Sequence, residues 1–195
     1  MRIIETMAYK FGELSAEAKE KALNHCREWQ TDHQWWEFVY DDAKEAGKII
    51  GIDIERIYFS GFASQGDGAC FEGWYSYKPN SCKQIRKFAP MDTDLHEIAD
   101  ALRNIQKVNF YQLRAGVKHR GHYYHENCTD IDIDRNDYKE PTEDAEESVK
   151  EYIRDFMRWI YSKLEKNYEW LTSDESVADM IEANEYEFDE YGNII

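Results

Sequence analysis

The chain has 195 residues, of which 42% are hydrophobic and 15% aromatic, and its formal net charge is −16. This apolar content is typical of a folded protein with one sizeable core and argues against intrinsic disorder, although the mean hydropathy is −0.82. No apolar run approaches the roughly 18 to 20 residues of a membrane helix. Because Arg2 and Glu5 lie where a signal peptide needs its apolar segment, we expect an intracellular protein that does not contact a membrane.

The negative charge is concentrated near the end of the chain. Residues 1–129 hold 19 acidic and 17 basic side chains, a difference of −2, whereas residues 130–195 hold 21 and 7, a difference of −14. Such a region repels nucleic acid, which argues against direct nucleic-acid binding and favours a partner with a basic surface. Because no linker is evident, we expect a single domain over residues 1–195. Its first part, residues 1–129, is near-neutral and α/β, and its second part, residues 130–195, is acidic and mainly helical.

The N-terminal quarter predicts a strand and two helices. Residues 2–11 open with apolar side chains and predict the strand. Ser15 is a good N-cap for a first helix, and residues 35–50 carry a second helical stripe that ends at Gly51. We expect the two helices to form an αα-hairpin, and the aromatic residues of WWEFVY are more typical of a core than of a base-stacking surface.

Residues 53–77 predict a β-hairpin, because two runs rich in Ile, Tyr, Phe and Trp flank a glycine-containing loop. The loop contains Gln65, Gly66, Asp67 and Gly68. Glycines let backbone N–H groups approach an anion, yet this loop has no GxGxxG pattern, no P-loop lysine and no helix directly after it. A structural turn is the simpler interpretation, and a recognition loop is the alternative.

Three helices are predicted in the rest of the chain. The basic segment KPNSCKQIRKFAP is interpreted as a solvated loop, after which Asp92 or Thr93 caps a helix with a clear apolar stripe. A long amphipathic helix is predicted over residues 143–171. Thr172 or Ser173 then caps a shorter helix, and a short extended segment ends the chain.

A second hairpin is predicted between these helices. Arg120-Gly121 fits a two-residue turn between strands at 111–119 and 122–133. If this turn forms, it fixes the register of the two strands. The expected partners are His119 with His122, Val117 with Tyr124, Ala115 with Glu126 and Leu113 with Cys128.

Two surfaces are candidates for binding. One side of the second hairpin is polar and basic, and with the loop of the first hairpin it suits a nucleotide. Its candidate residues are Gln65, Gly66, Asp67, Gly68, Arg114, Lys118, Tyr123, His125 and Asn127. The other surface is acidic, lies at the start of the long helix and suits a basic partner. Its candidate residues are Glu143, Asp144, Glu146, Glu147, Glu151 and Asp155.

Two groups of side chains resemble metal ligands. His119, His122 and Glu126 share one face of the predicted strands. A second group follows the spacing of an EF-hand loop: Asp132, Asp134, Asn136, Glu140 and Glu143. Because Asp137 replaces the glycine that this loop requires at its sixth position, a solvated acidic loop is preferred, and we assign neither a metal nor a cofactor.

Cysteine chemistry is a weaker candidate. Cys26, Cys70, Cys82 and Cys128 are far apart and form no CxxC pair, which is typical of reduced, buried thiols. Cys70 or Cys128 could pair with a histidine such as His125, but the chain has no GxSxG and no cysteine-protease motif. We assign no catalytic residue, and a small hydrolase is the last of the alternatives.

Two stretches resemble a known family. FSGFASQGDGACFEG in the first hairpin and LTSDESVADMIEANEYEFDEYGN near the end are similar to a family of small proteins encoded by bacteriophages and prophages, some labelled antitoxin-like. The resemblance implies a phage origin, a location in the host cytoplasm and a role against the host. It implies no catalytic residues.

Together these observations predict an α+β fold in which an antiparallel sheet of two central hairpins plus an N-terminal strand is packed by an αα-hairpin and a long C-terminal helix. The leading functional hypothesis is a non-enzymatic phage accessory protein that counters host defence by binding a basic host protein, with nucleic-acid mimicry as its mechanism. A protein that sequesters a nucleotide messenger is the first alternative. We leave open whether the chain forms a homo-oligomer.

Overall fold

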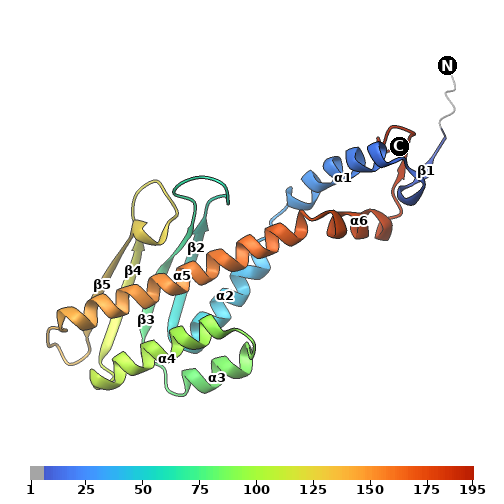
Figure 1. Ribbon diagram of the computed structural model, residues 1–195. Helices are drawn as coiled ribbons and strands as arrows, with labels where there is room; N and C mark the ends of the chain where they lie inside the picture. The colour runs from blue at the N-terminus through green and yellow to red at the C-terminus, as the bar shows by residue number, and fades with distance from the viewer. Residues whose placement is uncertain (1–6) are drawn as a thin grey trace. The chain divides into compact units, whose positions relative to one another are not determined.

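The computed structural model describes residues 7–195 as an α+β protein, as the sequence predicts (Figure 1). The chain forms two compact units. The first combines both ends of the chain, Met1–Glu37 and Glu165–Ile195, and the second is continuous, Phe38–Leu164. The sequence predicted one domain, and the charge boundary at residue 129 falls inside the second unit.

The first unit is built around a small apolar core. Its elements are β1 (Tyr9–Lys10), η1 (Phe11–Glu13), α1 (Ala16–Thr31), the end of α5 (Glu143–Leu171), α6 (Asp174–Ala183) and β6 (Glu187–Phe188). Ser15 caps α1 as predicted, and Ser173 caps α6, because each hydroxyl oxygen accepts a backbone N–H three residues later. The buried side chains of the core are Leu14, Ala18, Ala22, Cys26, Val177, Ile181 and Phe188.

The predicted N-terminal strand is present as β1, and residues 2–6 of that prediction lie outside the described part of the chain. β1 pairs antiparallel with β6 in a two-stranded sheet of its own. It is therefore not a strand of the sheet that the two central hairpins form.

The second unit contains a four-stranded antiparallel sheet in the order β2-β3-β4-β5. Its strands are β2 (Ile52–Phe59), β3 (Ala69–Ser76), β4 (Leu113–His119) and β5 (Thr129–Arg135). Neighbouring strands are also consecutive in the chain, so both predicted hairpins belong to one sheet. Their connecting loops, residues 60–68 and 120–128, lie at the same end of that sheet (Figure 1).

The helices described in this unit lie on one side of the sheet, where α3 packs on α4. They are α2 (Glu37–Ile50), α3 (Ser81–Phe88), α4 (Thr93–Val108) and most of α5. Phe71 of β3 packs on Phe156 of α5, and Gln106 of α4 donates a hydrogen bond to the Tyr75 hydroxyl. No described helix of this unit covers the opposite face, where Trp74 is 56% exposed.

The predicted register of the second hairpin is wrong. Ala115 pairs with Ile133 and not with Glu126, and a longer loop, residues 120–128, replaces the two-residue turn. The predicted register would have placed a carboxylate opposite the buried Ala115, whereas the observed register places the β-branched, apolar Ile133 opposite it. The other observed partners are Leu113 with Arg135, Val117 with Ile131 and His119 with Thr129.

The basic segment that was predicted to be a loop contains α3. Cys82 and Ile85 are one turn apart and buried, so this charged segment has a narrow apolar side that can pack on α4. Arg86 and Asp100 of α4 form an ion pair at 2.5 Å. Across residues 7–195, no helix is both long and apolar enough to span a membrane.

Candidate functional site

The two hairpin loops contact each other. A Cβ atom at Gly68 would lie 3.1 Å from the backbone of both Tyr124 and His125, so a side chain at this position would press on the second loop, which the glycine avoids. The Asp67 carboxylate accepts backbone N–H groups of its own loop, including that of Ser64 at 2.7 Å, and these bonds lower the pKa of Asp67. The first loop is therefore closed by its own hydrogen bonds.

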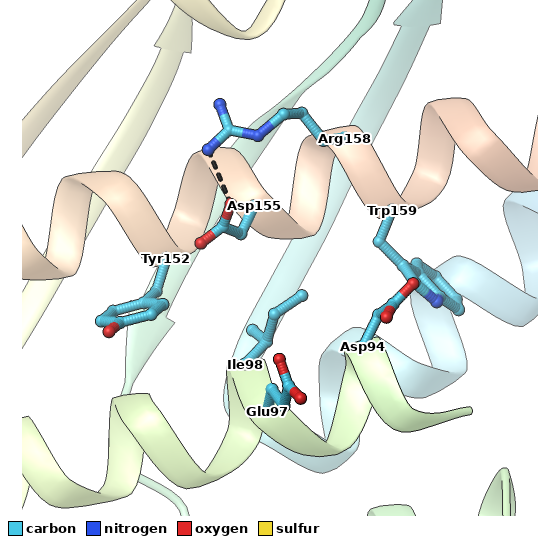
Figure 2. A pocket seen from close by; sticks show the side chains of 7 residues that line it. All are labelled: Asp94, Glu97, Ile98, Tyr152, Asp155, Arg158 and Trp159. Carbon is cyan, nitrogen blue, oxygen red and sulfur yellow. Dashed lines mark hydrogen bonds and ion pairs between the residues drawn. The ribbon is translucent and has the colours of Figure 1, made fainter. Parts of the chain in front are cut away.

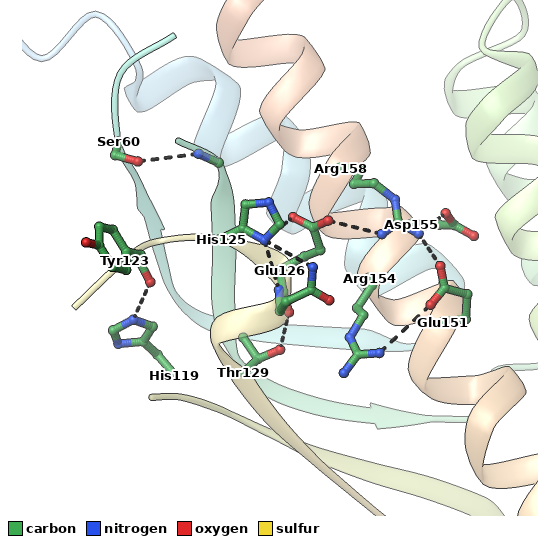
Figure 3. A network of polar contacts seen from close by, with 12 residues as sticks. Ser60, His119, Tyr123, His125, Glu126, Thr129, Glu151, Arg154, Asp155 and Arg158 are labelled. Carbon is green, nitrogen blue, oxygen red and sulfur yellow. Dashed lines mark hydrogen bonds and ion pairs between the residues drawn. The ribbon is translucent and has the colours of Figure 1, made fainter. Parts of the chain in front are cut away.

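Polar contacts also hold the second loop (Figure 3). His125 Nδ1 accepts the N–H of Asn127 at 3.2 Å, so two predicted ligand residues bind to each other. The carboxylate of Glu126 lies 3.2 Å from Arg158, which ties the loop to α5. Tyr123, another predicted nucleotide-binding residue in this loop, is 65% exposed.

The structure does not gather the predicted nucleotide-binding residues into one site. Arg114 lies near the start of β4, at the end of the sheet away from the two loops, and forms an ion pair with Asp134. Lys118 lies opposite Asp130. Because Asp132 is exposed between these two aspartates, the face that was predicted to be basic carries three carboxylates from β5.

The metal and thiol candidates are also separated. Across residues 7–195, no group of three or more His, Cys, Asp or Glu side chains is arranged to hold a metal ion. Asp134 of the EF-hand candidates is bound to Arg114, and Glu143 begins α5. Cys70 is fully buried, and burial raises the pKa of its thiol to about 12, so the thiol stays protonated and is a poor nucleophile.

The predicted acidic surface lies on the first half of α5, where some carboxylates have cationic partners. Glu146 lies 3.2 Å from Lys150. Arg158 is held by Glu151 at 2.5 Å, by Asp155 at 2.6 Å and by Glu126. Burial disfavours the charge of Arg158, but the hydrogen bonds to these carboxylates outweigh burial and raise its pKa. The remaining members of the predicted surface are exposed: Glu143, Asp144 and Glu147.

A pocket of about 310 Å³ opens between α4 and α5 (Figure 2). Asp94 and Glu97 extend from α4 toward α5, and within residues 7–195 neither carboxylate has a hydrogen-bond or ion-pair partner. Arg158 is the one cation among the lining residues, and three carboxylates already bind it. The lining is completed by Ile98, Tyr152, Asp155 and Trp159.

Asp92 fixes the start of α4 against α5 beside this pocket. Its carboxylate accepts the N–H of Leu95 at 3.1 Å and the indole N–H of Trp159 at 2.9 Å, and it lies 2.7 Å from Lys163. Burial alone would raise the pKa of Asp92, but these contacts outweigh burial and lower it. These contacts of Asp92, which we call the Asp92 clamp, hold the Trp159 ring as one wall of the pocket.

Sequence reasoning did not identify Asp94, Glu97 or Trp159 as site residues. Asp94 and Glu97 are one turn apart on the polar side of a correctly predicted helix, and this spacing is the signal that could have marked them. Their position opposite α5 depends on tertiary packing, which helical periodicity does not report.

Comparison with known proteins identifies a family for the part of the chain that contains this pocket. Residues 35–174 match a family described as Domain of unknown function (DUF8835), and this match spans the whole second unit. No curated protein and no solved structure matches the chain. Since the match covers well over half of the sequence, the chain belongs to the DUF8835 family.

Proposed function

We propose that this protein is a non-enzymatic binding protein that holds a basic surface of a partner protein on the acidic face formed by α4 and α5. The observation that carries this proposal is the pocket between the two helices. In the described chain, Asp94 and Glu97 have no cationic partner, whereas the pocket's own cation, Arg158, is already neutralised. Unpaired carboxylates of this kind attract a cation and interact favourably when it arrives.

The pocket also has the apolar surface that a basic side chain needs. The stem of a lysine or arginine is apolar, and it would contact the small part of Ile98 and Trp159 that lines the pocket. The ring of Tyr152 can face the charged end. Glu143, Asp144 and Glu147 extend the negative charge along α5 and would steer a basic partner toward the pocket.

The resemblance to proteins of bacteriophages and prophages suggests the biological setting. We place the partner among host defence proteins that have a nucleic-acid-binding surface, which this protein would cover by charge mimicry. Inhibition of this kind requires a complementary surface and no reaction. The fully buried Cys70, whose raised pKa makes it a poor nucleophile, argues against a hydrolase that uses this thiol.

Affinity capture from host lysate tests this proposal when a pocket variant and a matched control are compared. The variant Asp94→Asn/Glu97→Gln removes the two unpaired carboxylates. The control Asp179→Asn/Glu182→Gln removes two exposed carboxylates with the same spacing on α6. The wild type and the control should retain the same basic protein, which high salt releases and the pocket variant loses. Equal retention by the two variants would contradict the proposal.

A further inference from the structure

The uncovered face of the four-stranded sheet carries an exposed tryptophan at its centre. Trp74 of β3 is 56% exposed, although β3 is an interior strand. Its indole N–H donates to Glu55 of β2 at 3.2 Å. At its other end, the six-membered ring lies over Gly116 of β4, where an added Cβ atom would be 3.0 Å from the ring. The indole thus lies across the sheet from β2 to β4.

Across the strands, the residues that pair with Trp74 lead to an aspartate of β5. Trp74 pairs with Gly116, and Gly116 pairs with Asp132 of β5. On either side of Asp132 along β5, Asp130 forms an ion pair with Arg120 and Asp134 forms one with Arg114. Asp132 has no hydrogen-bond or ion-pair partner within residues 7–195. Because adjacent strands are about 4.8 Å apart, the ring above Gly116 lies within reach of this carboxylate.

We propose that the uncovered sheet face docks an arginine side chain of a basic partner, which stacks on Trp74 and forms an ion pair with Asp132. The inference takes the basic partner from the proposed function but uses a different surface of the second unit. Charge complementarity identifies the occupant, because the exposed indole lies between Asp132 and the β2 carboxylates Asp53 and Glu55. Arg114 and Lys118 flank Gly116 on the same face, but each lies opposite a carboxylate of β5, Asp134 and Asp130, so an anionic ligand would still meet net negative charge around the ring.

Arginine fits this arrangement better than lysine. Its planar guanidinium can stack on an indole while its N–H groups remain free to bind a carboxylate in the plane of the group. A lysine ammonium can bind the carboxylate, but it is a compact point charge with no plane to stack. Gly116 leaves the space in which the ring of Trp74 can lie over the sheet. The surface should therefore distinguish two peptides of equal charge.

Fluorescence anisotropy with labelled hexa-arginine and hexa-lysine tests the inference. We expect the full chain to bind hexa-arginine about threefold more tightly, the size of an exposed cation–π interaction. Trp74→Ala should abolish this preference, whereas Trp170→Ala, which removes a 62% exposed tryptophan of α5, should keep it. Asp132→Asn should weaken hexa-arginine binding more than Asp179→Asn does. Equal affinity of the wild type for both peptides would overturn the inference, as would a preference that survives Trp74→Ala.

Two further measurements distinguish an arginine site on the sheet from a nucleic-acid site and from the α4–α5 pocket. Binding of single-stranded oligothymidylate that is lost in Trp74→Ala would overturn the inference, because the face would then recognise bases and phosphate. Asp94→Asn/Glu97→Gln should weaken both peptides equally and leave their ratio unchanged. If that variant leaves both affinities unchanged while the ratio of hexa-arginine to hexa-lysine affinity still depends on Trp74, the α4–α5 proposal fails and the inference of an arginine site on the sheet stands.

Discussion

At the scale of single residues, Asp92 has the most concentrated set of contacts near the candidate site. One carboxylate caps α4, accepts the indole N–H of Trp159 and pairs with Lys163. Trp159 is almost fully buried, so the loss of this acceptor would leave a buried N–H group without a partner. The shape of the pocket therefore depends on a residue that does not line it.

Asp92→Ala should lower the free energy of unfolding by about 2 to 4 kcal/mol, from the lost cap and the unpaired indole N–H. Urea denaturation measures this loss, and Asp179→Asn should change the free energy by less than about 0.5 kcal/mol. A loss no larger than that of the Asp179 control would show that the clamp does not stabilise the fold.

The same residue predicts a pH dependence. The pKa of Asp92 lies below its ordinary value of 3.8 in the folded protein, so its stabilising effect is complete above that value and is lost as the pH falls through the lowered pKa. The stability difference between the wild type and Asp92→Asn should therefore shrink below about pH 4, since a protonated aspartate resembles asparagine. A difference that stays constant down to about pH 2 would argue against the ion pair.

At the scale of elements, local patterns predicted the helices well and strand pairing poorly. The apolar stripe over residues 143–171 is long and strictly local, and α5 spans Glu143–Leu171. α3 was missed because only Cys82 and Ile85 mark its buried side among charged neighbours. The β4–β5 register depends on which apolar residues meet across the sheet, and a turn signal at Arg120-Gly121 does not contain that information.

Engineered disulfides can distinguish the two registers in the intact chain. Lys118 and Asp130 are exposed partners in the observed register, so Lys118→Cys/Asp130→Cys should form a cross-strand disulfide under mild oxidation. Lys118→Cys/Tyr123→Cys, the pair that the predicted register would bring together, should stay reduced. Mass spectrometry detects whether each disulfide has formed. Both pairs are introduced together with Cys128→Ser, which removes the partly exposed native thiol. Oxidation of the second pair alone would favour the predicted register.

At the scale of the whole molecule, each of the two units buries apolar side chains of its own within residues 7–195. Composition could not predict this division, because the first unit joins segments from both ends of the chain and no linker marks it in the sequence. The acidic excess was visible in the sequence, but Asp94 and Glu97 belong to the near-neutral part of the chain. They join the acidic face only because α4 packs beside α5.

The two cores predict separate responses to a core mutation. Val177→Ala removes buried methyl groups from the first unit and should destabilise it by about 1 to 3 kcal/mol. Hydrogen exchange measured by mass spectrometry on the full chain should become faster in α1 and α6 and stay unchanged in β2–β5. Leu113→Ala in the sheet is the reciprocal control. Equal acceleration in both units would show a single cooperative fold.

The central claim is that a basic partner binds the pocket between α4 and α5, and one affinity comparison tests it most directly. Isothermal titration with hexa-arginine at physiological salt compares the wild type, Asp94→Asn/Glu97→Gln and Asp179→Asn/Glu182→Gln. Both variants lose the same charge, so only the position of the carboxylates differs. The pocket variant should bind about tenfold more weakly than the wild type, and the α6 variant less than about twofold more weakly. Equal losses in the two variants would show that the protein responds to overall charge, and they would contradict the claim.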